Sequence, residues 1–185
     1  MPDYKSLRNP YDFANPVRDR SLFFGRGETL TEVEYYLNHG KQSGRPINLA
    51  LIGPRASGKT SVLNMIGLEA QKLGFLVARV DLDESDAATQ LTFFFKVFDS
   101  ILFASCNEGV YGGCRGATYD AYVSMMYSLA VPSDLTFCPF LFPLQYATAM
   151  RGQNVHAPVS DAAFRHDLVA IQVEARRPIA ILFDE

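Results

Sequence analysis

Apolar residues recur along the chain at two spacings that predict alternating strands and helices. Three segments are almost continuously apolar, as in strands of a parallel sheet covered on both faces: residues 47–52, 75–82 and 179–185. Apolar positions at helical spacing predict helices in the intervening chain: residues 23–40, 61–73, 86–104 and 161–177. This alternation predicts an α/β domain built on a parallel sheet.

Two parts of the chain do not follow this alternation. Residues 1–22 place Pro2, Pro10 and Pro16 among charges, which predicts an extended arm lying over the domain formed by residues 23–185. Residues 105–158 add more chain than one crossover needs, so we expect an insertion there. Within it, the apolar segment Leu135–Leu144 contains two prolines. We expect it to cover the core or form an edge strand, and the alternative is a docking surface for a partner.

A glycine-rich loop separates the first predicted strand from the following helix. Gly53, four further residues and then Gly58, Lys59 and Thr60 match the pattern G-x-x-x-x-G-K-[ST]. Glycines let the backbone N–H groups curl around an anion, and the helix N-terminus adds a positive partial charge. Lys59 would reach the β and γ phosphates of a nucleotide, and the Thr60 hydroxyl would hold Mg²⁺. The alternative is a chance match in a glycine-containing turn.

The expected phosphate contacts cover the whole loop and the first turn of the helix: Gly53, Pro54, Arg55, Ala56, Ser57, Gly58, Lys59, Thr60 and Ser61.

Acidic residues follow the two other predicted strands. Asp184 and Glu185 stand at the carboxyl end of the last strand, the edge at which ligands bind in parallel sheets. Asp184 is the predicted second Mg²⁺ ligand, and Glu185 and Lys59 are the predicted catalytic residues, with Glu185 accepting a proton from the attacking water. Asp81 and Asp83 end the middle strand; we favour a helix-capping role for these two over a metal-facing one.

Composition narrows the class of protein. Seventeen basic and 20 acidic residues give a formal charge of −3, so no global basic field indicates a nucleic-acid partner. The three cysteines form no C-x-x-C pair, and the three histidines lack metal-ligand spacing. The N-terminal segment lacks the apolar core of a secretory signal, and no apolar run is long enough to span a membrane. We therefore expect a cytoplasmic protein.

Three segments together resemble the AAA+ and STAND branches of the P-loop NTPases. They are GPRASGKT at residues 53–60, ILFDE at residues 181–185 and FFGRGETL at residues 23–30. The last is similar to an F-x-G-R-x-x-E-L element that lies near the adenine in these families, which implies that Phe24, Gly25 and Arg26 flank the base. The alternative is an ordinary helix-start loop capped by Glu28 or Thr29.

The resemblance implies a three-layer sandwich and a Mg²⁺-dependent ATPase that couples nucleotide state to conformational change or assembly. A slow or non-hydrolysing signalling switch, a DNA-associated initiator and a GTPase or small-molecule kinase are the alternatives. In these families a sensor strand, an arginine finger and a lid follow the Walker B strand that ends here at Asp184 and Glu185. We therefore expect the remainder of the polypeptide, another subunit or a homo-oligomer to complete the domain.

Overall fold

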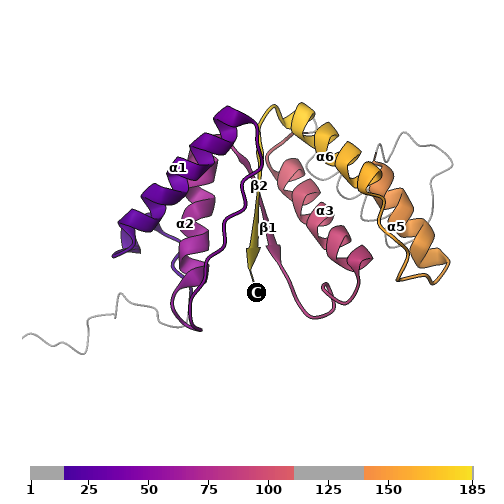
Figure 1. Cartoon of the computed structure of the whole chain (residues 1–185), viewed down its shortest axis with the longest axis horizontal. Coiled ribbons are helices and arrows are strands. Elements are labelled where there is room, and N and C mark those ends of the chain that lie inside the picture. The colour runs from indigo at the N-terminus through magenta and orange to yellow at the C-terminus, as the bar shows by residue number, and fades with distance from the viewer. Residues whose placement is uncertain (1–14, 111–139, 185) are drawn as a thin grey trace, which may run out of the picture. The chain divides into compact units, whose positions relative to one another are not determined.

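The computed structural model describes residues 15–110 and 140–184 as parts of two compact units, which divide between Leu73 and Gly74 (Figure 1). In this part of the chain the fold is mixed α/β, with five α-helices and a two-stranded parallel sheet. The α/β class is therefore confirmed, and the three-layer sandwich stays a prediction.

The first unit contains the helices α1 (Gly27–Ser43) and α2 (Lys59–Lys72), preceded by the short 3-10 helix η2 (Arg20–Leu22). The two long helices pack side by side, and their apolar faces are buried (Figure 1). The buried apolar side chains of this unit are Phe23, Leu30, Val33, Val62, Leu63, Met65, Ile66 and Ala70. Lys41 of α1 also donates a hydrogen bond to the carbonyl of Leu73, beyond the end of α2, at 2.6 Å.

Both predicted helices of this unit exist, but the first ends later than the sequence pattern indicates. Gly40 was the predicted stop, and it lies inside α1. The helix ends at Ser43 because Gly44 adopts the left-handed conformation, with φ of 64°, which glycine reaches without steric cost. Gly40 has a packing role instead: a Cβ there would lie 3.3 Å from Cδ1 of Ile47.

The predicted first strand, residues 47–52, is wrong. The segment is irregular, Leu49 is 46% exposed and Ile52 is 95% exposed. An apolar run becomes a strand only when a neighbouring strand pairs with its backbone, and the two strands that pair in the described part of the chain both belong to the second unit. The composition of residues 47–52 does not show whether the described chain contains a neighbouring strand that pairs with them.

The second unit is built around the strands β1 (Leu76–Asp81) and β2 (Ile179–Asp184). They pair in parallel, with Leu76 opposite Ile179 and Asp81 opposite Asp184. Alternate β1 side chains, Leu76, Ala78 and Val80, are fully buried. The predicted second and third strands are thus confirmed, and they are neighbours.

Helices α3 (Gln90–Asn107), α5 (Leu141–Arg151) and α6 (Asp161–Ala175) complete the second unit. Helix α3 packs against β1, and α5 and α6 pack together beside α3 (Figure 1). A cluster of phenylalanines fills the space between these helices: Phe94, Phe98, Phe140, Phe142 and Phe164. The predicted helices 86–104 and 161–177 are confirmed with shifted ends; Thr89 forms a capping box with Thr92 and starts α3.

The proline-containing segment Leu135–Leu144 is described from Phe140 onward, where it leads into a helix and not an edge strand. Phe142 and Pro143 are fully buried, so these residues cover the core as expected. The carboxylate of Asp167 accepts hydrogen bonds from the backbone N–H groups of Leu141 and Phe142, at 3.0 and 2.7 Å. A side chain on α6 therefore caps α5, which a local sequence pattern could not indicate.

Several predictions concern residues outside the described ranges: the first 14 residues of the arm, the part of the predicted insertion between residues 111 and 139, and Glu185. Within residues 15–110 and 140–184, no helix combines the length and apolar character needed to cross a membrane.

Candidate nucleotide-binding site

The Gly53–Thr60 loop wraps around the amino group of its own lysine. Lys59 begins α2, and its Nζ donates hydrogen bonds to the carbonyls of Gly53 and Pro54, each at 3.0 Å. Gly58 has φ of 82° and Ala56 has φ of 63°, so both adopt the left-handed conformation. These two turns bring the loop back on itself, and the Ser57 N–H donates to the Pro54 carbonyl at 3.3 Å.

Gly53 lies close to the side chain of Ser57 across the loop. A Cβ at this position would lie 2.9 Å from Oγ of Ser57 and 3.7 Å from its Cβ. A larger residue at position 53 would therefore require the Ser57 hydroxyl to turn away, while the Ser57 Cβ could stay in ordinary contact.

Helix α2 begins directly at the loop without a side-chain cap. Its N-cap residue is Gly58, which offers no side-chain acceptor. The first N–H groups of a helix have no carbonyl partner within the helix. An anion held in the loop would face these N–H groups of Lys59, Thr60 and Ser61 and the positive end of the helix dipole.

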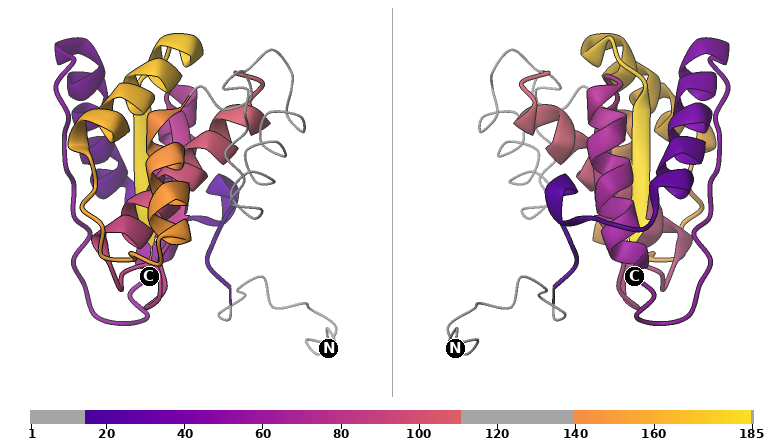
Figure 2. Two further views of the ribbon diagram at one scale, coloured as in Figure 1. Left: turned by 90° about the vertical axis from the view of Figure 1, so that its right-hand side faces the viewer. Right: turned by 90° about the vertical axis from the view of Figure 1, so that its left-hand side faces the viewer.

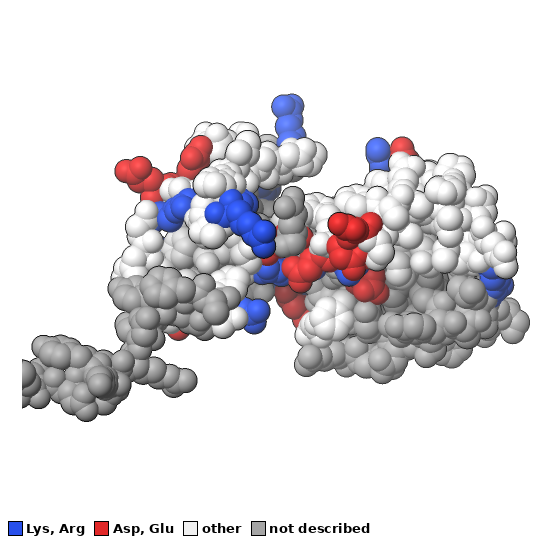
Figure 3. All heavy atoms as spheres, turned by 90° about the horizontal axis from the view of Figure 1, so that it is seen from below, with Lys and Arg blue, Asp and Glu red and all other residues white. Residues whose placement is uncertain are grey.

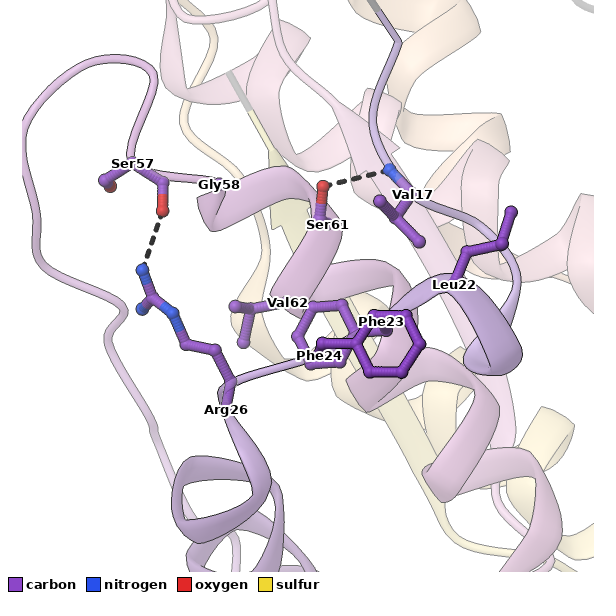
Figure 4. A pocket seen from close by; sticks show the side chains of 9 residues that line it. All are labelled: Val17, Leu22, Phe23, Phe24, Arg26, Ser57, Gly58, Ser61 and Val62. Carbon is purple, nitrogen blue, oxygen red and sulfur yellow. Dashed lines mark hydrogen bonds between the residues drawn. The ribbon is translucent and has the colours of Figure 1, made fainter. Parts of the chain in front are cut away.

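The element FFGRGETL contacts the loop through Arg26. Its guanidinium donates a hydrogen bond to the carbonyl of Ser57 at 2.8 Å (Figure 4). Arg26 is also the N-cap residue of α1, but its side chain makes no capping hydrogen bond there. Gly25 precedes it with φ of 81°, which turns the chain at this point. Arg26 therefore connects the helix start to the loop instead of capping the helix.

A pocket of about 270 Å³ lies beside the loop within the first unit. Figure 4 shows Phe23 and Phe24 on one side, with Ser57 and Gly58 of the loop on the other. The lining residues are Val17, Leu22, Phe23, Phe24, Arg26, Ser57, Gly58, Ser61 and Val62. The lining combines apolar side chains with a few polar groups, and the pocket is open to solvent, since the Phe24 side chain is 74% exposed.

Sequence reasoning identified Phe24 and Arg26 as pocket residues but missed Val17, Leu22, Phe23 and Val62. The apolar run Leu22–Phe24 before a helix could have indicated the first side of the pocket. Val17 is a single apolar residue in a polar arm, and no sequence signal marks it. Val62 was assigned to the helix core, and its buried side chain also borders the pocket.

Asp184 lies in the second unit, where Arg79 binds it. The Arg79 guanidinium pairs with Asp184 and with Asp81, in the second case at 2.8 Å. Asp81 and Asp184 stand at the carboxyl ends of β1 and β2, as predicted, and the pairing of the strands places them opposite each other. The favoured capping role of Asp81 is wrong, because its carboxylate pairs with Arg79 of its own strand.

Asp83 organises a turn ahead of α3 and does not cap the helix. Its carboxylate accepts hydrogen bonds from the Ser85 hydroxyl and from the N–H groups of Ser85 and Asp86. The Ser85 side chain, followed by the Asp86 backbone, lowers the pKa of Asp83. The N-cap residue of α3 is Thr89, so the prediction that Asp83 caps this helix is wrong.

The donors predicted for Mg²⁺ are suited in chemistry to that ion. Thr60 offers a hydroxyl oxygen beside the loop and Asp184 a carboxylate, both hard oxygen ligands of the kind that Mg²⁺ takes in addition to phosphate and water. The described residues contain no group of three or more His, Cys, Asp or Glu side chains able to hold a metal ion. Thr60 belongs to the first unit and Asp184 to the second, so each donor suits Mg²⁺ by its own chemistry, and the shared Mg²⁺ site stays a prediction.

The face drawn in Figure 3 carries both basic (blue) and acidic (red) side chains, so this face is not uniformly basic.

No known protein-family model matches the chain, and neither a curated protein nor a solved structure matches it significantly. The functional assignment therefore depends on the residues themselves.

Proposed function

We propose that the chain binds ATP with Mg²⁺ at the Gly53–Thr60 loop. The supporting observation is the course of the loop: it turns back on itself through the left-handed residues Ala56 and Gly58, holds Nζ of Lys59 with two of its own carbonyls, and leads into α2, whose N-cap residue Gly58 offers no side-chain acceptor. The β and γ phosphates would take the place of the Gly53 and Pro54 carbonyls as partners of Lys59. The apolar pocket lined by Phe23 and Phe24 would accept the base.

We extend the proposal to slow ATP hydrolysis of the AAA+ or STAND type. Mg²⁺, held by Thr60 and Asp184, would neutralise phosphate charge when bound. Glu185 would accept a proton from the attacking water, and Lys59 would stabilise the charge that develops on the γ phosphate. Nucleotide state would then control conformation or assembly with a partner or a second copy.

Binding is tested by isothermal titration calorimetry with Mg²⁺-ATP. Lys59→Ala removes the ammonium group and should weaken binding by at least about tenfold, because a hydrogen bond to a charged group contributes about 1.5–3 kcal/mol. Lys72→Ala is the matched control: Lys72 lies at the far end of the same helix and pairs with Glu69. Equal ATP affinity in all three proteins, or no binding by the wild type, would refute the proposal.

Hydrolysis is tested separately by phosphate release under multiple turnover, with Glu185→Gln as the variant. The ATPase proposal predicts release by the wild type that falls at least about a hundredfold in the variant, within the range of general acid–base catalysis. ATP binding without measurable turnover would instead favour the non-hydrolysing switch.

A further inference from the structure

The segment before α1 contacts α2 through the backbone of Val17 and, further along, through an ion pair of Arg20 with Glu69 at 3.9 Å. The Val17 N–H donates to Oγ of Ser61 at 2.9 Å, and Nδ2 of Asn64 donates to the Val17 carbonyl at 2.9 Å. Ser61 and Asn64 are three residues apart on α2, so they lie on the same face of the helix. Both polar backbone groups of Val17 are thus bound by side chains from one helix. Figure 2 shows this segment, in indigo, beside α2.

Val17 is also one of the residues that line the pocket beside the loop. Figure 4 shows it next to Ser61, on the side of the pocket away from Arg26 and Ser57. The wall it contributes comes from an exposed segment, since Asn15, Pro16 and Arg18 around it are all exposed. The position of Val17 in the pocket wall therefore depends more on its two hydrogen bonds with α2 than on burial of the adjacent residues.

We infer that Ser61 and Asn64 are positioning residues that hold residues 15–18 against α2 as a wall of the base pocket, so that docking of this segment and base binding strengthen each other. The inference depends on the proposed nucleotide site and adds to it a role for the arm. The linkage is reciprocal: whatever the docked segment adds to nucleotide affinity, bound nucleotide adds to docking of the segment. Phosphate binding in the loop does not use this wall.

Calorimetry with two ligands separates this role from a general structural one. Mg²⁺-ATP carries a base, whereas Mg²⁺-tripolyphosphate offers phosphates alone. Asn64→Ala should weaken ATP binding by about fivefold, in the range expected for the loss of one hydrogen bond, and leave tripolyphosphate affinity unchanged. Asn38→Ala is the matched control, because Asn38 makes a local hydrogen bond to the Glu34 carbonyl within α1.

Limited trypsin digestion of the wild-type chain provides a second test that needs no variant. Arg18 in the docked segment and Arg20 in the 3-10 helix that follows it are both exposed and offer cleavage sites. Mg²⁺-ATP should slow cleavage after both residues severalfold, and Mg²⁺-tripolyphosphate should not. Asn64→Ala should speed this cleavage in the absence of ligand.

The outcomes distinguish the two proposals. If the wild type binds ATP but Asn64→Ala binds both ligands as tightly as the wild type, and ATP leaves the cleavage rate unchanged, the linkage is refuted and the nucleotide site stands. If Asn64→Ala weakens the binding of ATP and of tripolyphosphate by the same factor, Asn64 supports the loop itself. This result would also refute the linkage. Failure of the wild type to bind ATP refutes both proposals.

Discussion

At the residue scale, two features characterise the loop: the short distance between Gly53 and Ser57, and the ammonium group of Lys59, whose carbonyl partners an anion could replace. A Cβ at Gly53 would lie 2.9 Å from Oγ of Ser57, so a methyl group there would make the Ser57 side chain turn away. Lys59 is held by two carbonyls of the loop, which are neutral partners. Because phosphate oxygens are charged, they form stronger hydrogen bonds with an ammonium group than carbonyl oxygens do. The loop is therefore suited to exchange its internal contacts for an anion.

Gly53→Ala should reduce ATP affinity about threefold, an effect of the size of a lost or weakened hydrogen bond. The new Cβ would lie 2.9 Å from Oγ of Ser57, so the Ser57 side chain must turn away inside the loop that faces the phosphates. Gly27→Ala is the control, since a Cβ at Gly27 meets nothing within 4 Å. Calorimetry measures both variants. Unchanged affinity in Gly53→Ala would show that the ligand does not depend on the shape of this loop.

At the element scale, the sequence predicts helices and paired strands well and isolated segments poorly. The strands ending at Asp81 and Asp184 and the helices α2 and α6 lie where their apolar spacing indicates, because each buries its apolar side against a neighbour. Residues 47–52 have the same composition as a strand but lack a paired neighbour in the described chain. The start of α2 directly after the glycine-containing loop was predictable, because the signals for a turn and for a helix start are local. The contacts of Val17 and Asp167 were not, because they join distant residues.

Asp167→Ala should destabilise the second unit by about 2 kcal/mol. The fully buried carboxylate caps α5 through two backbone N–H groups, and its loss leaves both without an acceptor. Asp161→Ala, an exposed change on the same helix, is the control. Urea unfolding monitored by circular dichroism measures the difference in the free energy of unfolding between each variant and the wild type. A loss below about 0.5 kcal/mol would contradict the capping role.

At the scale of the whole molecule, the proposals for binding and hydrolysis depend on different parts of the chain. The loop, Arg26 and the base pocket all belong to the first unit, so binding can be argued from that unit alone. The hydrolysis proposal also invokes Asp184, which belongs to the second unit. The first unit therefore carries the central claim.

Nucleotide should stabilise the folded chain by mass action. At a free Mg²⁺-ATP concentration of about one hundred times Kd, the free energy of unfolding of the part that binds should rise by about 2.7 kcal/mol. Unfolding curves in urea with and without the nucleotide measure this change, and Lys59→Ala should show a much smaller shift at the same concentration. Equal shifts in both proteins would mean that ATP binds elsewhere.

The most direct test of the central claim is hydrogen–deuterium exchange of the backbone amides at residues 56–60, with and without Mg²⁺-ATP. If phosphates occupy the loop, these amides donate to them and should exchange at least about tenfold more slowly with ATP, while exchange in α5 and α6 stays unchanged. ATP binding that leaves residues 56–60 unprotected, or protects only other segments, would contradict the account.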